Sequence, residues 1–274
     1  MKNQLKAICS KASVIFVATV IFAATASAVP TPIYTVDGNL SDWGVSPFVS
    51  WSPSSPEVVW DEDNYTGSGA YPNGGEAFDV EALYAEVDSD YLYLALVFSM
   101  PQAGVDDPYG RPIHYFPGDI ALDLDNDGST GEYGYEFGLG LNSGNEGEIF
   151  GMPDWSLPNG SVGFPENTPS TIESGTFLAD ALFAYTNAGD LEGNGTDTYV
   201  VEAAILLSDI GVEFGAGDSF LVHYTLDCGN DLIEVEGLIT ETSSIPEPST
   251  VMGIAMGLMF VANALRCKIS RRQK

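Results

Sequence analysis

The sequence predicts an all-β protein, an antiparallel β-sandwich or jelly roll, flanked by one apolar segment at each terminus. Short runs of β-branched and aromatic residues recur along the chain, and clusters of Gly, Asn, Asp and Pro separate them. Apart from one helical turn expected at residues 208–211, no sustained helical period lies between the two apolar segments. The roughly 217 residues between those segments suit a single all-β domain, so we expect one domain at residues 29–240.

The first 28 residues have the layout of a secretory signal peptide. Three lysines among the first 11 residues precede an apolar run at residues 12–24, and an Ala-Ser-Ala cleavage site follows at residues 26–28. A basic start, a short apolar run and a small-residue site are typical of export signals that are removed. Residues 1–28 are therefore excluded from the fold prediction. An uncleaved N-terminal anchor is the alternative.

Two hairpins are the clearest local predictions. Residues 79–87 and 91–98 are rich in strand formers, and the polar turn Asp88-Ser89-Asp90 separates them. Residues 118–123 and 133–141 form a second candidate pair around an Asp-Asn-Asp-Gly turn. Between residues 120 and 125, Ile and Leu alternate with Ala and Asp. That period of two predicts a strand with leucines on one face and aspartates on the other.

Other strand-forming runs complete the predicted sandwich. Residues 44–75 are rich in Pro, Ser, Gly and Asn and indicate a long loop or an insertion on the ligand side. Residues 241–250 form a linker that leads to the C-terminal apolar segment. The further strands are expected at residues 176–185, 198–207, 219–226 and 232–238.

The C-terminal 29 residues combine a tripeptide, an apolar span and a basic tail. Pro246, Glu247 and Pro248 precede the mostly apolar residues 251–265, and five Lys and Arg residues lie within residues 266–274. Fifteen helical residues cover about 22 Å, whereas a bilayer core is about 30 Å thick, so this is a short membrane span. The basic tail should stay cytoplasmic and leave the rest of the chain outside.

This arrangement resembles the PEP-CTERM sorting signal of Gram-negative bacteria. The resemblance implies that an exosortase at the inner membrane recognises and removes the segment after transient membrane insertion through the C-terminal helix. The product would then reach the cell surface or the extracellular matrix. A permanent tail anchor without processing is the alternative.

The segment between the signals is strongly acidic. Residues 29–245 contain one basic residue, Arg111, and 38 Asp and Glu residues, a formal charge of −37. Nucleic acids and anionic lipids are excluded as partners, because phosphate binding needs Lys and Arg. Such a charge favours divalent cations, and self-repulsion should destabilise the fold unless cations screen it.

The start of the domain carries a second resemblance. Residues 36–43, Val-Asp-Gly-Asn-Leu-Ser-Asp-Trp, are similar to the D-G-x-x-x-D-W opening of DOMON-like sandwiches and of family-nine carbohydrate-binding modules. The resemblance implies a β-sandwich with sugar, haem or calcium as the ligand. Haem is not favoured here, since His114 and His223 are expected to be a loop histidine and a core histidine.

One turn has the composition of a calcium loop. Asp123, Asp125 and Asp127 alternate, and Gly128 follows, as in the first half of an EF-hand loop. The twelfth position is Gly134 rather than Glu, and the flanks are expected to be strands. We therefore predict a calcium site at the three aspartates, with a solvated hairpin turn as the alternative. Weaker candidates are the acids at residues 61–63 and 106–107.

Aromatic side chains supply candidates for glycan binding. Trp51, Trp60 and Trp155 lie near Pro- and Gly-rich segments, where exposed rings could stack on sugars. Core packing is the alternative for each of them, and Trp43 is expected to pack in the core behind the opening motif.

The sequence therefore predicts an exported, non-enzymatic protein that binds glycan or calcium through a β-sandwich, with extracellular polysaccharide as a partner. No motif for a catalytic serine, a zinc protease or a paired-cysteine zinc site is present, and no catalytic residue is assigned. Two rivals remain: a carbohydrate-active enzyme that uses a carboxylate pair, and a purely structural surface protein.

Overall fold

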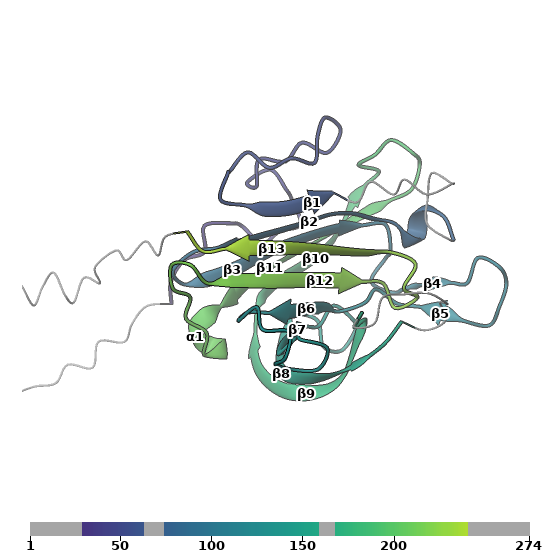
Figure 1. Cartoon of the computed structure of the whole chain (residues 1–274). Coiled ribbons are helices and arrows are strands. Elements are labelled where there is room, and N and C mark those ends of the chain that lie inside the picture. Colours follow the sequence, from purple (N-terminus) through teal and green to yellow (C-terminus); the bar gives the residue numbers. More distant parts are fainter. Residues whose placement is uncertain (1–28, 63–73, 159–167, 241–274) are drawn as a thin grey trace, which may run out of the picture. The chain divides into compact units, whose positions relative to one another are not determined.

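Two antiparallel sheets form the framework of the described part of the protein. The structure is a computed structural model that describes residues 29–62, 74–158 and 168–240. Figure 1 shows the strands of the two sheets as stacked layers. In spatial order, the five-stranded sheet consists of β1 (Val59–Glu62), β2 (Val80–Val87), β3 (Tyr91–Phe98), β11 (Thr198–Leu206) and β10 (Leu182–Gly189).

The second sheet has six strands, and a separate pair of short strands lies outside both sheets. The pair consists of β4 (Val105–Asp106) and β5 (His114–Tyr115), and the two short helices are η1 (Glu76–Phe78) and α1 (Leu207–Ile210). In spatial order, the six strands are β13 (Leu232–Leu238), β12 (Ser219–Thr225), β6 (Ile120–Asp123), β7 (Phe137–Leu139), β8 (Glu148–Ser156) and β9 (Thr171–Asp180).

The main hydrophobic core lies between the two sheets. Leu94 and Leu96 of β3 and Val201 of β11 contribute to it from one side, and Ile120 and Val222 from the other. Each buried aliphatic side chain of this kind contributes about 1.5–3 kcal/mol through its removal from water. This arrangement is that of a β-sandwich, as the strand pattern predicts.

Both predicted hairpins are present. β2 and β3 pair across Asp88-Ser89-Asp90, and β6 pairs with β7 across the acidic turn. Ile120 and Leu122 face the core, whereas Ala121 belongs to a small cluster on the outer face of the second sheet. The predicted alternation is therefore confirmed. β11, β12, β13 and the turn α1 also form at the predicted positions.

One predicted strand is wrong and others were missed. Residues 176–185 are not one strand, because the chain leaves the six-stranded sheet after β9, turns at Ala181 and joins the five-stranded sheet as β10. β8 was missed because it contains Gly151 and Pro153, residues that weaken a strand pattern. β1 falls within the predicted loop at residues 44–75.

The N-terminal part of the domain covers the outer face of the five-stranded sheet. Trp43 is buried there and stacks on Tyr34 with ring centroids 4.0 Å apart, so its predicted core position is confirmed. The buried carboxylate of Glu202 in β11 accepts hydrogen bonds from Trp43 Nε1 at 2.7 Å and from Gly38 N at 2.6 Å. It also accepts bonds from the N–H groups of Asp37 and Asn39. The opening motif thus folds around a carboxylate of the sheet.

The strand registers define two ends of the sandwich. The first residue of β2, Val80, pairs with Phe98 at the end of β3, and its N–H donates to Asp231 just before β13. We call this the η1 end, because η1 precedes β2. At the α1 end, Asp123 closes β6 and pairs with Leu221 near the start of β12. In Figure 1, α1 and the β4–β5 pair mark the two ends.

Within the described ranges, no helix is long and apolar enough to cross a membrane. The predicted signal peptide, the Pro246-Glu247-Pro248 motif, the apolar span at residues 251–265 and the basic tail all lie outside the described residues.

Candidate functional site

Three carboxylates meet at the α1 end, between β6 and β7. Asp123 is the last residue of β6, and Glu136 directly precedes Phe137, which pairs with Leu122 of β6. Asp125 lies in the turn between them. One carboxylate oxygen from each of Asp123, Asp125 and Glu136 lies within 4.8 Å of the other two. Antiparallel pairing therefore brings Glu136 back beside the two aspartates.

Asp123 is buried and Glu136 is half-buried, and each has one buried oxygen without a hydrogen-bond partner among the described residues. Asp123 is only 3% exposed, and its Oδ1 has no hydrogen-bond partner among the described residues. Glu136 accepts a hydrogen bond from Leu124 N at 2.6 Å through Oε1, but its buried Oε2 has none. A buried carboxylate oxygen without a partner costs free energy, which a bound cation would offset.

The electrostatics of the cluster reflect this burial. Removal from water is the main cause that raises the pKa of Glu136 to about 7. Burial likewise raises the pKa of Asp123, and the charge of Asp125 adds to the effect. In both residues the cost of burial outweighs the backbone hydrogen bonds that favour the ionised form. A divalent cation would offset that cost.

The two remaining aspartates of the predicted loop have different roles. Asp125 Oδ1 accepts hydrogen bonds from Asp127 N at 3.0 Å and from Thr130 Oγ1 at 3.1 Å, which fixes the turn. Asp127 is exposed and accepts from the hydroxyl and N–H of Ser129, and the hydroxyl bond lowers the pKa of Asp127. The structure therefore groups Asp123 and Asp125 with Glu136 and leaves Asp127 outside the group.

The turn is anchored to neighbouring strands and borders open space. Asn126 has a positive φ of 51°, and its Nδ2 donates to Ser219 Oγ of β12 at 2.7 Å. A pocket of about 600 Å³ lies beside the cluster, and Asp125 and Glu136 are among its lining residues. Glu213 and Asp218 line it from the connection between α1 and β12. An ion and its water ligands can therefore reach the cluster.

The residues present fit calcium. The cluster offers only oxygen atoms, and calcium takes six to eight oxygen ligands in flexible geometry. Three carboxylates can supply at least three of them, and main-chain oxygens or water can supply the rest. Sequence reasoning missed Glu136 because it counted loop positions as in an EF-hand. The pairing of residues 118–123 with 133–141 was the signal that could have found it.

The weaker acidic candidates at residues 106–107 are bound to other groups of the protein. Asp107 is bound to Arg111, with the carboxylate 2.5 Å from Nε, and it also accepts from Tyr109 N. Asp106 Oδ1 lies 2.8 Å from His114 Nδ1. Asp61 bonds the N–H of Glu62, and Asp63 lies outside the described residues.

The three tryptophan candidates differ in exposure. Trp51 and Trp155 are buried, in the N-terminal layer and in the outer cluster of the six-stranded sheet respectively. Trp60 of β1 is partly buried and stacks on Tyr84 at 6.2 Å between ring centroids. It lines a pocket of about 430 Å³ together with Asp61 and with Glu234 and Glu236 of β13. Trp60 is therefore the candidate for which the structure provides a lined surface pocket.

Of the two histidines, His223 is buried as expected, whereas His114 lies in the short strand β5 and not in a loop. His114 lies in the β4–β5 pair, with Nε2 2.7 Å from the Ala103 carbonyl oxygen as well as Nδ1 beside Asp106. His223 of β12 is buried, with Nδ1 2.8 Å from Glu234 Oε1. Each lies beside a carboxylate, and neither has a histidine or a cysteine as a hydrogen-bond partner among the described residues.

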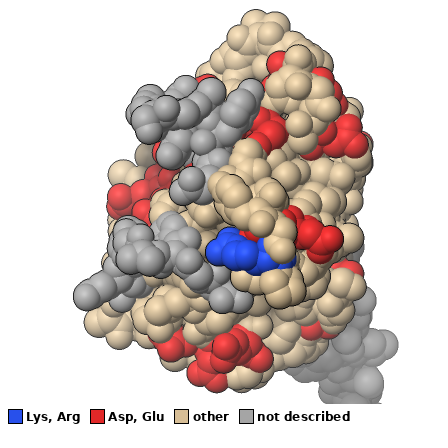
Figure 2. Space-filling model, turned by 90° about the vertical axis from the view of Figure 1, so that its right-hand side faces the viewer, with Lys and Arg blue, Asp and Glu red and all other residues tan. Residues whose placement is uncertain are grey.

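The surface is acidic, as the composition requires. Figure 2 shows one basic patch with several acidic patches around it, on the side of the molecule that carries the β4–β5 pair. Arg111 is the only Lys or Arg in residues 29–245, and it is already paired with Asp107. Carboxylates elsewhere in the domain must therefore be balanced from solution.

Comparison with known proteins gives no family assignment: no protein-family model matches the chain, and no curated protein matches it significantly.

Proposed function

We propose that this chain is an exported, non-enzymatic β-sandwich protein that binds calcium at Asp123, Asp125 and Glu136. The observation that carries the proposal is the pair of buried carboxylate oxygens without partners, Asp123 Oδ1 and Glu136 Oε2. They lie in an all-oxygen cluster beside a pocket, in a domain whose one arginine is engaged elsewhere. Calcium is the common extracellular cation whose ligand preference suits this cluster.

The route to the outside is part of the proposal. The signal peptide at residues 1–28 would direct export, and the tail with Pro246-Glu247-Pro248 would hold the chain in the inner membrane until an exosortase removes it. The support is the resemblance of the tail to PEP-CTERM signals and the basic residues that follow its apolar span. The mature protein would then lie at the cell surface or in the extracellular matrix of a Gram-negative bacterium.

We further propose that the domain is a DOMON-like sandwich. The support is the opening motif at residues 36–43 and its part in the fold, since its N–H groups and Trp43 gather around Glu202. In this assignment the motif builds the sandwich rather than a ligand site.

Glycan binding at Trp60 is a second candidate function. Its support is a partly buried aromatic ring in a pocket of about 430 Å³ that also holds three carboxylates. Aromatic faces bind sugar rings through apolar contact, and carboxylates accept hydrogen bonds from hydroxyl groups. A glycan array with the wild type and Trp60→Ala tests this function, and equal signals from both would reject it.

Calcium titration of the metal-stripped full chain in mild detergent tests the main proposal. The double variant Asp123→Asn with Glu136→Gln should bind one calcium fewer than the wild type. Asp127→Asn should keep the full number, because Asp127 lies outside the cluster. The matched control is Glu173→Gln with Asp180→Asn, which removes two exposed negative charges elsewhere.

Two results would reject the calcium site. One is an unchanged stoichiometry in the Asp123 and Glu136 variant. The other is an equal loss in the Glu173 and Asp180 control, which would mean that only the general charge matters. A broad glycosidase screen on the same samples tests the rival enzyme function, since hydrolysis by the purified chain would contradict a non-enzymatic role.

A further inference from the structure

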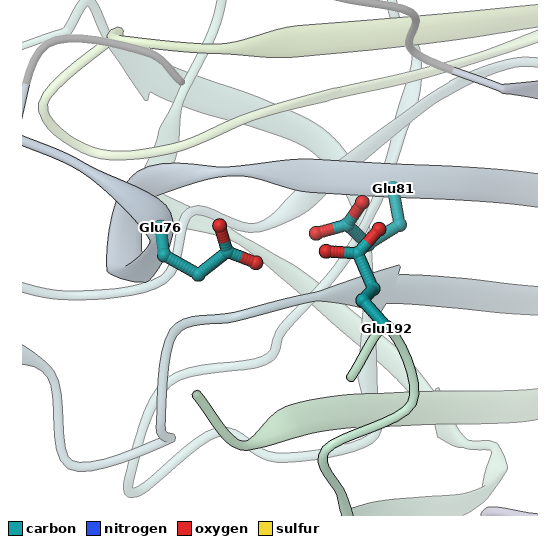
Figure 3. A group of neighbouring side chains, drawn as sticks. All are labelled: Glu76, Glu81 and Glu192. Carbon is teal, nitrogen blue, oxygen red and sulfur yellow. The ribbon is translucent and has the colours of Figure 1, made fainter. Parts of the chain in front are cut away.

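A second group of carboxylates lies at the η1 end, opposite the Asp123 cluster. It consists of Glu76 of η1, Glu81 of β2 and Glu192 of the connection between β10 and β11. One carboxylate oxygen from each lies within 4.8 Å of the other two. In Figure 3 the carboxylates of Glu81 and Glu192 meet, and that of Glu76 points toward them from the other side. We call this group the glutamate trio.

A β-bulge and a folded connection direct the side chains of Glu81 and Glu192 toward each other. Val80 pairs with Phe98 and Ala82 with Val97, so Glu81 is the extra residue of a β-bulge. Bulges redirect side chains relative to the regular alternation of a strand. On the opposite side, Asp190 accepts hydrogen bonds from the N–H groups of Gly193, Asn194 and Gly195, which folds the connection that carries Glu192.

The trio contains two buried oxygens that no group of the described residues satisfies. Glu81 is 6% exposed, and its Oε1 has no hydrogen-bond partner among the described residues. The buried Oε2 of Glu76 has none either. Burial raises the pKa of Glu81 to about 10 and that of Glu76 to about 7, and neighbouring carboxylates add to both shifts. The ionised trio is therefore costly unless a positive charge joins it.

The protein provides no such charge. Among the described residues, the donor that reaches the trio is the neutral amide of Asn194, whose Nδ2 lies 2.5 Å from Glu76 Oε1 and 2.8 Å from Glu192 Oε2. Asp79 adds another negative charge nearby. Arg111, the one basic residue of the domain, is bound to Asp107. Compensation must come from solution, either as protons or as a metal ion.

We propose that the glutamate trio is a second divalent-cation site, occupied by calcium in the exported protein. Three glutamates from separate elements surround one small space. Two of their oxygens, Glu76 Oε2 and Glu81 Oε1, have no hydrogen-bond partner among the described residues. Carboxylate oxygens suit hard cations, and calcium tolerates the irregular geometry of three long side chains better than magnesium does. Among the described residues the site contains no histidine or cysteine that would favour zinc or copper.

The site would have a mechanical consequence. Its ligands come from η1, from the bulge of β2 and from the connection between β10 and β11. An ion bound by all three would tie the connection between β10 and β11 to η1 and to the bulge of β2. The connection should therefore exchange its amide hydrogens more slowly in calcium than in a chelator.

Protonation is the rival explanation, and the variant Glu81→Gln separates the two. A glutamine resembles a protonated glutamate in shape and charge, so it should relieve the repulsion in the trio as a proton does. In a chelator, Glu81→Gln should melt no lower than the wild type. In calcium, the wild type should gain more in melting temperature than the variant, because only the wild type keeps the full site.

The experiment combines these melting curves with calcium counting on the metal-stripped full chain in mild detergent. Glu81→Gln with Glu192→Gln should bind one calcium fewer than the wild type. The control Glu173→Gln with Asp180→Asn should bind the wild-type number. Asp123→Asn with Glu136→Gln should lose a different calcium, so that the combination of both double variants loses two. Near-ultraviolet circular dichroism in the chelator checks that each variant folds.

The outcomes distinguish this inference from the proposed function. If the trio variant keeps the full calcium number and the full calcium gain, the trio is compensated by protons and the inference is overturned. If only the Asp123 and Glu136 variant keeps the full calcium number and the full calcium gain, the trio is supported as a site and the proposed site at Asp123, Asp125 and Glu136 is rejected. Magnesium at the same concentration should produce a smaller gain, and an equal gain would overturn the assignment to calcium.

Discussion

Glu202 shows how one residue can organise a whole layer of this protein. Its buried carboxylate accepts four N–H groups from the opening motif, which belongs to a segment far away in the sequence. Glu202→Gln would turn an N–H₂ group toward some of these donors. We expect a loss of about 2–3 kcal/mol in the free energy of unfolding, since hydrogen bonds to charged groups are among the stronger ones. Urea unfolding measures it, and a loss equal to that of the exposed Glu173→Gln would contradict this role.

Asp119 gives the clearest pH dependence at the scale of a residue. Its carboxylate accepts the N–H groups of Leu141 and Ile172 and the amide of Asn142, and burial raises its pKa from 3.8 to about 6. A raised pKa in the folded state means that the stability from this group is present below pH 3.8 and is lost as the pH rises through 6. The expected change is up to about 3 kcal/mol over this window.

Asp119→Asn removes this titration. The free energy of unfolding of the wild type, relative to that of Asp119→Asn, should therefore fall as the pH rises from 4 to 6.5. Denaturant unfolding at several pH values provides the comparison, and two parallel curves would show that Asp119 does not titrate in this range.

At the scale of the elements, the close approach of β6 to its neighbours depends on a glycine. A Cβ on Gly118 would lie 1.9 Å from the carbonyl oxygen of Thr225 and 2.8 Å from that of Ser170. Gly118→Ala must therefore push β6 away from β12 and weaken the bond from Asp119 N to Ser170 O. We expect a loss of about 3 kcal/mol, near the upper end for overpacked sites.

Gly128 is the matched control for that substitution. A Cβ there would meet nothing within 4 Å, and its φ is not positive. Gly128→Ala should change the stability by less than about 0.5 kcal/mol. Thermal unfolding of both variants compares them, and equal losses would contradict the steric argument.

The elements also show what the sequence could and could not predict. The hairpin of β2 and β3 was predictable, because two strand-forming runs flank a short polar turn. β8 was not, because it pairs with β9 across several register shifts and Met152 within it has a positive φ. The same distinction applies to the site. Asp123 and Asp125 belong to a local motif, whereas Glu136 joins them only through strand pairing, and Glu81 and Glu192 meet only through the tertiary fold.

At the scale of the whole molecule, the described domain and the predicted C-terminal signal are separate parts of the sequence. The described sheets end at β13, before the linker and Pro246-Glu247-Pro248. Removal of residues 246–274 should abolish retention at the cell envelope and leave the domain folded. Cell fractionation and circular dichroism test both parts of this expectation. An unfolded or insoluble product would contradict the independence of the domain.

The charge of −37 at residues 29–245 gives the whole molecule a general response to salt, which has to be separated from specific calcium binding. Sodium chloride screens repulsion between exposed carboxylates but cannot replace a coordinated ion. A ligand at 100 times its dissociation constant adds about 2.7 kcal/mol to stability for each site. A specific site must therefore raise the melting temperature beyond the effect of ionic strength.

The most direct measurement is the melting temperature of the metal-stripped chain in calcium chloride and in sodium chloride of equal ionic strength. We expect calcium to give the larger increase. This calcium-specific part should be smaller in Asp123→Asn with Glu136→Gln, and unchanged in Glu173→Gln with Asp180→Asn. Equal increases in the two salts, or a full calcium-specific increase in the Asp123 and Glu136 variant, would contradict a calcium site at Asp123, Asp125 and Glu136.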